Sequence, residues 1–348
     1  MVDTPQRRPN MQQIADAAGV SKSAVSLALR NDPRLPEATR QRIQQLADEM
    51  GYRRNPVVDA LMTQLRAERQ PAFQANLGLI NCSPYKDLRE NHTFRRLRRG
   101  VLNRAEEMGY GVEEFWLNQP DMRPQRLKQI LETRGIRGLI LIAALSPDAI
   151  NESYNSFWQT FACAVLGVTH LKNQLSCSTN DQYLTSRRAT QKVLEFGYGR
   201  PLLVVPPQDD HLLDNKFSAG FNSAVATLPK NDQLGILPLE MNRLDEALEK
   251  IHKLKPDVII TNKIELHDAL QAAELRIPQD LALVHLDWHD EIEHLAGMRQ
   301  NNRMVGSAGV DLVVGQLQKN EIGQLAFPKV VQLESIWVDG ATCPAKTS

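Results

Sequence analysis

Residues 10–31, NMQQIADAAGVSKSAVSLALRN, carry the pattern that decides the first part of the fold. Apolar residues recur at helical spacing over 11–18, and Gly19 follows as a residue suited to end a helix. Ser21 is a favourable N-cap for a second helix, whose buried side would include Val25. Two short helices joined by a glycine turn are typical of a helix-turn-helix, which presents its second helix to the DNA major groove. An ordinary helical hairpin is the alternative.

Helical patterns continue for about another forty residues. A third helix is predicted from Pro36, which suits a first helical position, to Gly51, which would end it. Three helices over about fifty residues make a small domain. A further helical pattern covers 57–69, and 70–76 is interpreted as a linker.

Composition limits the possible classes of protein. The chain has 348 residues, 42% of them hydrophobic, which predicts two or three domains with real cores. The net charge is zero, but residues 1–70 hold 11 Lys and Arg against 8 Asp and Glu, a mildly basic balance. The four cysteines are scattered without a CxxC pair, which favours a reduced protein over a disulfide scaffold or zinc site.

Targeting signals are not evident in the sequence. The first ten residues lack the apolar core of a signal peptide, and the longest apolar run, 138–145, is far too short to cross a bilayer. We therefore expect a cytoplasmic protein without a membrane association.

From Leu77 onward, short apolar runs alternate with amphipathic helical stretches. The predicted strands are 77–81, 138–143, 202–205, 258–261 and 281–286. The predicted helices lie near 94–108, 124–134, 183–196, 216–227, 244–254 and 265–275. This alternation predicts α/β doubly wound sheets, and the length predicts two lobes. Ligands in such folds bind outside the carboxyl ends of the strands.

Several motifs resemble one known family in order and spacing. The amino-terminal ones are Met11-x-x-Ile14-Ala15-x-x-Ala18-Gly19-Val20-Ser21, Val25-Ser26, Glu37-x-Thr39-Arg40 and Gly51-Tyr52-x-x-Asn55-Pro56. Weaker downstream motifs include Arg99-Gly100, Phe196-Gly197-Tyr198, Ala219-Gly220-Phe221, Ile277-Pro278 and Leu286-Asp287. On these motifs the chain resembles the lactose-repressor (LacI) family of bacterial transcription regulators.

The resemblance implies a function and a division into domains. A helix-turn-helix domain at 1–56 would be followed by a hinge helix and linker at 57–76. A two-lobed core at 77–348, similar to periplasmic binding proteins, would bind a small effector, possibly a sugar, and form a homodimer. The dimer would bind palindromic operator DNA as a repressor, with no cofactor. Effector binding would change operator affinity by an allosteric coupling of about 1–3 kcal/mol.

The family pattern also implies which residues contact DNA. Lys22 and Ser23 would read base edges, with Ser26 and Leu27 continuing the same face. Further residues are placed for phosphates, which position the protein without specifying sequence. These are Arg40, Tyr52, Arg53 and Asn55, with Arg42 as a further candidate.

The hinge segment leaves two alternatives open. Leu61 aligns with the leucine that family members insert into the minor groove at the dyad. Asp59, however, brings a negative charge to a place that should meet phosphates, and the segment is several residues longer than usual. Either a longer helix still inserts Leu61, or the two subunits pair through Leu61, Met62 and Leu65, or these residues pack on the core.

The family pattern implies an effector site between the lobes. Asn91, His92 and Phe94 match the loop after the first core strand. Asn262 and Asp287 match positions that hydrogen-bond ligand hydroxyls, and Trp288 could stack on a sugar face.

Some positions of this site depart from the family pattern. Phe217 stands where many members place a ligand-binding arginine, His92 replaces a proline, and Lys263 replaces an aspartate after Asn262. A different or charged effector, or none, remains open. Arg299-Gln300 aligns with a crossover between the lobes.

Other functions find less support in the sequence. The spacing of His285, Asp287, His289 and His294 is irregular, so a metal site is not expected. A solute-binding module without a regulatory role is the main alternative, and the helix-turn-helix argues against it. We expect no enzyme, since GxSxG, GxxxxGK[ST] and strand-linked GxGxxG motifs are missing from the sequence.

Overall fold

The computed structural model describes most of the chain, in the segments 11–29, 31–50, 52, 73–88, 90–144, 152–167 and 175–346. The helix predicted over 57–69 lies outside these segments.

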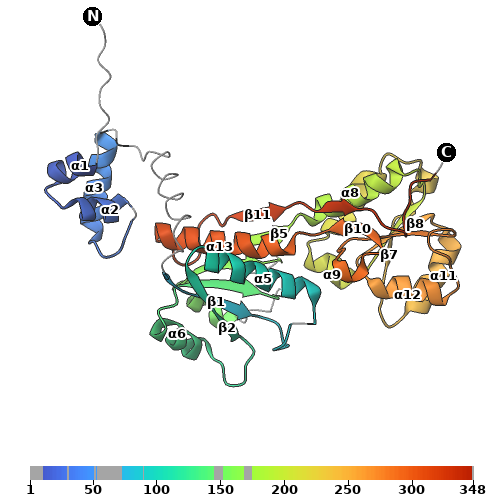
Figure 1. Cartoon of the computed structure of the whole chain (residues 1–348), viewed down its shortest axis with the longest axis horizontal. Coiled ribbons are helices and arrows are strands. Elements are labelled where there is room, and N and C mark those ends of the chain that lie inside the picture. The colour runs from blue at the N-terminus through green and yellow to red at the C-terminus, as the bar shows by residue number, and fades with distance from the viewer. Residues whose placement is uncertain are drawn as a thin grey trace, which may run out of the picture.

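Three helices form the amino-terminal domain, as the apolar spacing predicted. They are α1 (Met11–Ala18), α2 (Lys22–Leu29) and α3 (Glu37–Glu49) (Figure 1). Their buried stripes meet in one small core that includes Ile14, Val25 and Ile43, each with no exposed surface. Pro36 lies at the N-cap of α3, one residue earlier than predicted.

The first lobe is built on a six-stranded sheet whose pairs are all parallel, in the order β11-β5-β4-β3-β1-β2. Its strands are β1 (Ala75–Asn81), β2 (Tyr110–Trp116), β3 (Gly138–Ile142), β4 (Ala162–Leu166), β5 (Ser176–Asn180) and β11 (Val330–Leu333). Helices cover both faces: α6 (Pro124–Thr133) and α7 (Asn155–Trp158) on one, α5 (His92–Glu107) and α13 (Asn302–Lys319) on the other.

The second lobe repeats this architecture with the order β12-β10-β9-β8-β6-β7, in which only the β10–β12 pair is antiparallel. Its strands are β6 (Pro201–Val205), β7 (Ile236–Pro238), β8 (Val258–Thr261), β9 (Ala282–His285), β10 (Ala296–Arg299) and β12 (Ile336–Val338). Its helices are α8 (Gln182–Glu195), α9 (Pro207–Leu212), α10 (Lys216–Val225), α11 (Leu244–Leu254) and α12 (Ile264–Ala272). The expected pair of doubly wound α/β lobes is confirmed. Short 3-10 turns lie at Glu152–Tyr154, Lys230–Asp232 and Asp290–Ile292.

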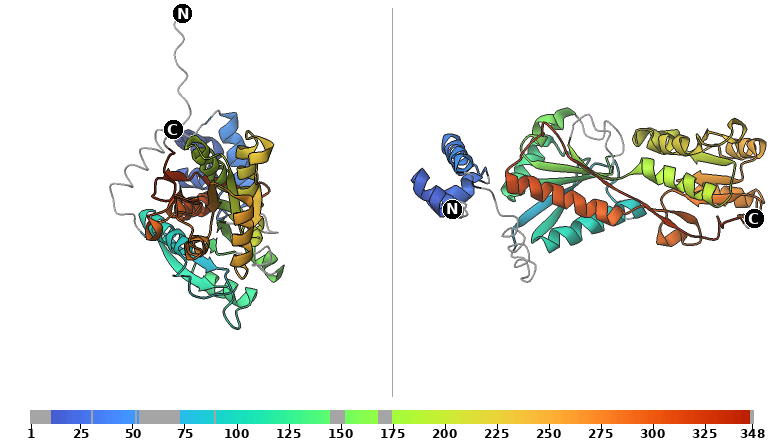
Figure 2. Two further views of the ribbon diagram at one scale, coloured as in Figure 1. Left: turned by 90° about the vertical axis from the view of Figure 1, so that its right-hand side faces the viewer. Right: turned by 90° about the horizontal axis from the view of Figure 1, so that it is seen from above.

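The chain passes between the lobes three times. It runs from β5 into α8, from β10 into α13, and from β11 into β12. Two views show these passages lying together between the sheets (Figures 1 and 2). The crossover predicted at Arg299-Gln300 is confirmed as the second passage. We call the segments near residues 181, 300 and 334 the lobe connections.

Helices α5 and α13 pack unusually closely on the first lobe. Gly100 of α5 faces the Arg303 carbonyl oxygen, and Gly306 of α13 faces that of Leu97. A Cβ atom at either glycine would lie far inside van der Waals contact with that oxygen. Helix α13, which begins next to the lobe connections, is therefore in backbone contact with α5.

Candidate functional site

Helix α2 presents its first turn to solvent. The Ser21 Oγ accepts a hydrogen bond from the Ala24 amide at 3.2 Å, which confirms the predicted N-cap. Val25 is buried in the domain core, whereas Lys22 and Ser23 are exposed. The two residues expected to read base edges thus lie on the accessible face of the second helix, as a major-groove contact requires.

The other described side chains expected to contact DNA are either less exposed or hydrogen-bonded within the domain. Leu27, Arg40 and Tyr52 are half-buried, and Tyr52 packs against the domain core. Arg40 donates from Nη1 to the Asp32 carbonyl oxygen at 3.2 Å, so part of its guanidinium holds the turn after α2. Arg42 similarly donates to the Ala18 carbonyl oxygen at 3.2 Å. The side chain of Ser26, and Arg53, Asn55 and Leu61, lie outside what the structure describes.

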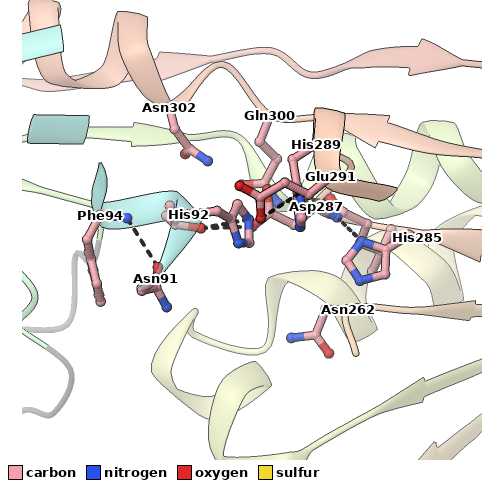
Figure 3. A network of polar contacts seen from close by, with 12 residues as sticks. Asn91, His92, Phe94, Asn262, His285, Asp287, His289, Glu291, Gln300 and Asn302 are labelled. Carbon is pink, nitrogen blue, oxygen red and sulfur yellow. Dashed lines mark hydrogen bonds and ion pairs between the residues drawn. The ribbon is translucent and has the colours of Figure 1, made fainter. Parts of the chain in front are cut away.

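A cluster of polar side chains joins the two lobes (Figure 3). The first turn of α5 supplies His92 and Thr93, and the loop after β9 supplies Asp287 and His289. The His92 Nε2 lies 2.9 Å from the Asp287 Oδ2, and the Thr93 Oγ1 donates to the same oxygen at 3.0 Å. The rings of His92 and His289 are 3.8 Å apart between centroids. We call these four residues the inter-lobe cluster.

Ion pairs extend this contact at the rim. Arg96 of α5 pairs with Asp290 at 2.8 Å, and Arg95 pairs with Glu291. The carboxylates of both pairs are well exposed, so each pair contributes little free energy on its own. The pairs nevertheless show that the lobes approach each other along this side.

Burial affects the protonation of the inter-lobe cluster and of the neighbouring His285. It lowers the pKa of His285 to about 4, with a smaller lowering effect from His289 and an opposing effect from Asp287. His285 Nδ1 correspondingly accepts a hydrogen bond from the Asp287 amide at 3.2 Å, which requires a neutral ring. Burial also lowers the pKa of His289. For Asp287, burial alone would raise the pKa, but the hydrogen bonds from His92 and Thr93 leave it lowered.

The carboxyl ends of β6 and β8 add a second polar group. Asp209 Oδ2 accepts from the Asn262 Nδ2 and pairs with the Lys263 Nζ, both at 2.8 Å. The Asn262 Oδ1 is buried and has no hydrogen-bond partner among the described residues. Asn262 and Asp287 both follow strands of the second lobe and appear in one close view (Figure 3).

The lobe connections contribute side-chain amides, most of which were not predicted from the sequence. Asn180 donates to the Asn302 Oδ1 at 2.7 Å, and Gln182 donates to the Gln300 Oε1 at 3.0 Å, so side chains link the first and second passages. Asn302 Nδ2 and Gln182 Oε1 remain buried without a partner among the described residues. Only the family alignment of Gln300 pointed towards this region.

Four expected effector residues take part in structural contacts. Asn91 caps α5, because its Oδ1 accepts from the Phe94 amide at 3.2 Å, and Phe94 packs against the first-lobe core. Phe217 is 2% exposed in the second-lobe core, so expecting it in the ligand site was wrong. Trp288 is 4% exposed, donates to the Leu295 carbonyl oxygen and is stacked by Arg299, so its face is not open to a sugar.

Metal ligation and membrane crossing find no support in the part of the chain that the structure describes. Among the described residues, no group of three or more His, Cys, Asp and Glu side chains is arranged to hold a metal ion. Within the same segments, no helix has the length and apolar character needed to cross a membrane.

An exposed recognition-type helix, two doubly wound lobes and a polar cluster between them define the class: a DNA-binding transcription regulator with a ligand-binding core. A model of bacterial regulatory proteins of the lacI family matches residues 10–55. A model of periplasmic binding proteins and the sugar binding domain of the LacI family matches residues 82–335. The chain belongs to the lacI family of bacterial regulatory proteins.

Individual relatives cover nearly the whole chain. The HTH-type transcriptional regulator GntR of Escherichia coli (strain K12) is 31% identical, over 94% of this chain and 96% of its own length. The Ribose operon repressor of the same strain is 22% identical, over 90% and 94% respectively. A transcriptional regulator CelR–cellobiose complex aligns with a TM-score of 0.62 at 18% identity, covering 96% of this chain and all of that one.

The lac repressor dimer bound to operator and the anti-inducer ONPF has a TM-score of 0.57 at 16% identity. It covers 97% of this chain and 100% of its own, which supports the same fold over both parts of the molecule.

Proposed function

We propose that this regulator is a repressor that binds a neutral, hydroxyl-rich effector between its lobes, and that the effector changes its affinity for a palindromic operator. The observation that carries the proposal is the set of buried polar atoms without partners. Hydroxyl groups both donate and accept, so those of one hydroxyl-rich ligand would donate to the Asn262 Oδ1 and the Gln182 Oε1 and accept from the Asn302 Nδ2. Leaving such atoms unpaired is costly.

The charges around the cluster favour a neutral effector over an anionic one. Among the described residues, Lys263 pairs with Asp209, Arg96 with Asp290 and His92 with Asp287. An anionic effector would have to compete with these carboxylates. Relatives support a carbohydrate, since they include a ribose operon repressor, a CelR–cellobiose complex and a regulator with bound ribose.

We place DNA recognition on α2, with Lys22 and Ser23 at the bases. A homodimer would match the two halves of a palindrome. We assign the protein to the cytoplasm, where its operator would lie, and we propose that it releases its ligand unchanged. A catalytic turnover of any sugar bound by the protein would contradict the last point.

Binding of sugars tests the effector site. Asn302→Asp keeps the oxygen that accepts from Asn180 but removes the free Nδ2 donor. We expect ribose, cellobiose or another neutral sugar of a panel to raise the melting temperature of the parent, and this rise to be lost in Asn302→Asp. Gln271→Ala, on the surface of α12, is the control and should behave as the parent does.

The operator is obtained by selecting DNA from a random pool with the full-length protein. We expect a palindromic sequence, and we expect the stabilising sugar to change the affinity of the protein for it. A panel of neutral sugars without any stabilising member, or stabilisation that persists unchanged in Asn302→Asp, would contradict the proposed site. Failure to enrich any DNA sequence would favour a solute-binding module.

A further inference from the structure

Asp287 uses its two carboxylate oxygens differently. Both contacts from the first lobe, from the His92 Nε2 and the Thr93 Oγ1, end on Oδ2. No hydrogen bond or ion pair from the described residues reaches Oδ1. The side chain keeps 20% of its surface exposed, and Oδ1 is not among the buried polar atoms that lack a partner in the described segments, so this oxygen retains access to solvent or ligand.

We propose that the inter-lobe cluster is a latch that holds the lobes closed before any effector binds, and that Asp287 links this latch to the effector through its free oxygen. His92 and Thr93 are the positioning residues, because they act on Asp287 from the opposite lobe. The second half of this proposal rests on the proposed function, whereas the latch itself does not.

The latch lies at the end of α5 that favours a carboxylate. Asn91 caps this 16-residue helix, so the Asp287 carboxylate meets the helix at its amino-terminal first turn. The amino-terminal end of a helix carries partial positive charge, which favours a carboxylate there. Thr93 and His92 then add directed hydrogen bonds, which are stronger when one partner is ionised.

The side chains also lie where solvent screens them little. His92 and Asp287 expose 22% and 20% of their side chains, and His289, stacked on His92, exposes 11%. The rim pairs of Arg95 and Arg96 have carboxylate partners that are 63% and 74% exposed. We therefore assign the closing interaction to the cluster and a minor role to the rim.

The latch has a consequence for effector binding. A ligand that donates a hydrogen bond to the Asp287 Oδ1 finds the carboxylate already oriented and the lobes already together. It avoids part of the cost of ordering its site, which raises affinity without any new contact. Without the latch, the same contact residues would bind the same ligand more weakly.

Distances between spin labels on the two lobes test the latch without a ligand. Gln129 of α6 and Glu249 of α11 lie on the outer helices of the two lobes, so each is replaced by cysteine and labelled. The native cysteines Cys82, Cys163, Cys177 and Cys343 are buried. In His92→Ala/Thr93→Val we expect a longer mean distance and a broader distribution than in the parent.

Matched controls lie away from the lobe contact. His252 is exposed on α11, and Thr227 donates to the Ala224 carbonyl oxygen within the second lobe. His252→Ala/Thr227→Val should keep the parental distance distribution. Circular dichroism checks that both double variants are folded, and Thr93→Val alone replaces the double variant if it is not.

An unchanged distance distribution in the folded latch variant would overturn the latch. The link to the effector is measured separately, with whichever neutral sugar stabilises the parent. We expect that sugar to bind the latch variant at least several-fold more weakly; equal affinity would overturn the link. Because the spin-label measurement uses no sugar, failure of the proposed effector site is distinguishable from failure of the latch.

Discussion

His285 shows how one buried side chain makes stability depend on pH. It is 3% exposed at the end of β9, and burial lowers its pKa to about 4. In the unfolded chain the same ring titrates near pH 6.5, so between these values protons bind the unfolded chain preferentially. The stability that the neutral ring contributes is fully present above pH 6.5 and is lost as the pH falls towards 4.

We therefore expect the melting temperature to fall on acidification from pH 7 to pH 4, with His285 contributing on the order of 3 kcal/mol. His289, whose pKa is also lowered, acts in the same direction. The stabilisation from Asp287 is lost only below its unfolded value of 3.8. In His285→Asn, which keeps an acceptor for the Asp287 amide, calorimetry should show a flatter profile. His252→Gln is the exposed control, and an equally steep profile in His285→Asn would contradict the assignment.

The proposed role of Lys22 also depends on a single group, its side-chain ammonium. Lys22→Ala should weaken binding to the selected operator by about 1–3 kcal/mol and reduce discrimination against a substituted base pair. Fluorescence anisotropy with the selected operator, and with a fragment that carries the substituted base pair, measures the two effects. Lys250→Ala, exposed on α11, should change neither. Equal loss on both fragments would make Lys22 a phosphate contact instead.

The sequence predicted single residues unevenly. Asp287, Asn262 and His92 were named, and all three take part in polar contacts at or beside the lobe contact. Phe217 was named from alignment and Trp288 from its place beside Asp287, but both side chains are buried by packing within the second lobe. Alignment gives a position along the chain, but the direction of a side chain depends on neighbours that only the fold supplies.

At the scale of elements, α13 and α5 depend on glycines at their contact. Gly306→Ala would place a Cβ against the Leu97 carbonyl oxygen, so we expect the unfolding free energy to fall by about 1–3 kcal/mol. Gly315, on the same helix, faces open space, with no atom within 4 Å of the position that a Cβ would take. Gly315→Ala should be neutral or stabilising by up to about 1 kcal/mol. Denaturant melts of both variants test this; equal stability would contradict the close approach.

The strands that the sequence predicted share a clear apolar signal. The five expected strands correspond to β1, β3, β6, β8 and β9, which are apolar runs buried on both faces. β5 was missed because its sequence, SCSTN, is polar although buried. α13 was missed because apolar residues and glycines are spread around the whole helix, as its close packing on α5 and the sheet requires.

On the scale of the whole molecule, the order of domains and the doubly wound class followed from the helix-turn-helix pattern and the strand–helix alternation. The contact between the lobes did not, because His92 and Asp287 lie 195 residues apart in the sequence. The exact domain boundary at 56 stays a prediction, since the structure describes the chain only up to 52 and again from 73, whereas β1 begins at Ala75, within the predicted linker.

The triple passage of the chain between the sheets restricts how the lobes can move. A single connection would allow the lobes to rotate relative to each other in any direction. Three neighbouring connections, two of them bridged by the Asn180–Asn302 and Gln182–Gln300 hydrogen bonds, resist torsion and sliding and leave bending as the easy motion. A chemical signal received between the lobes would thereby be converted into rotation about one fixed axis, a mechanical output with a single degree of freedom.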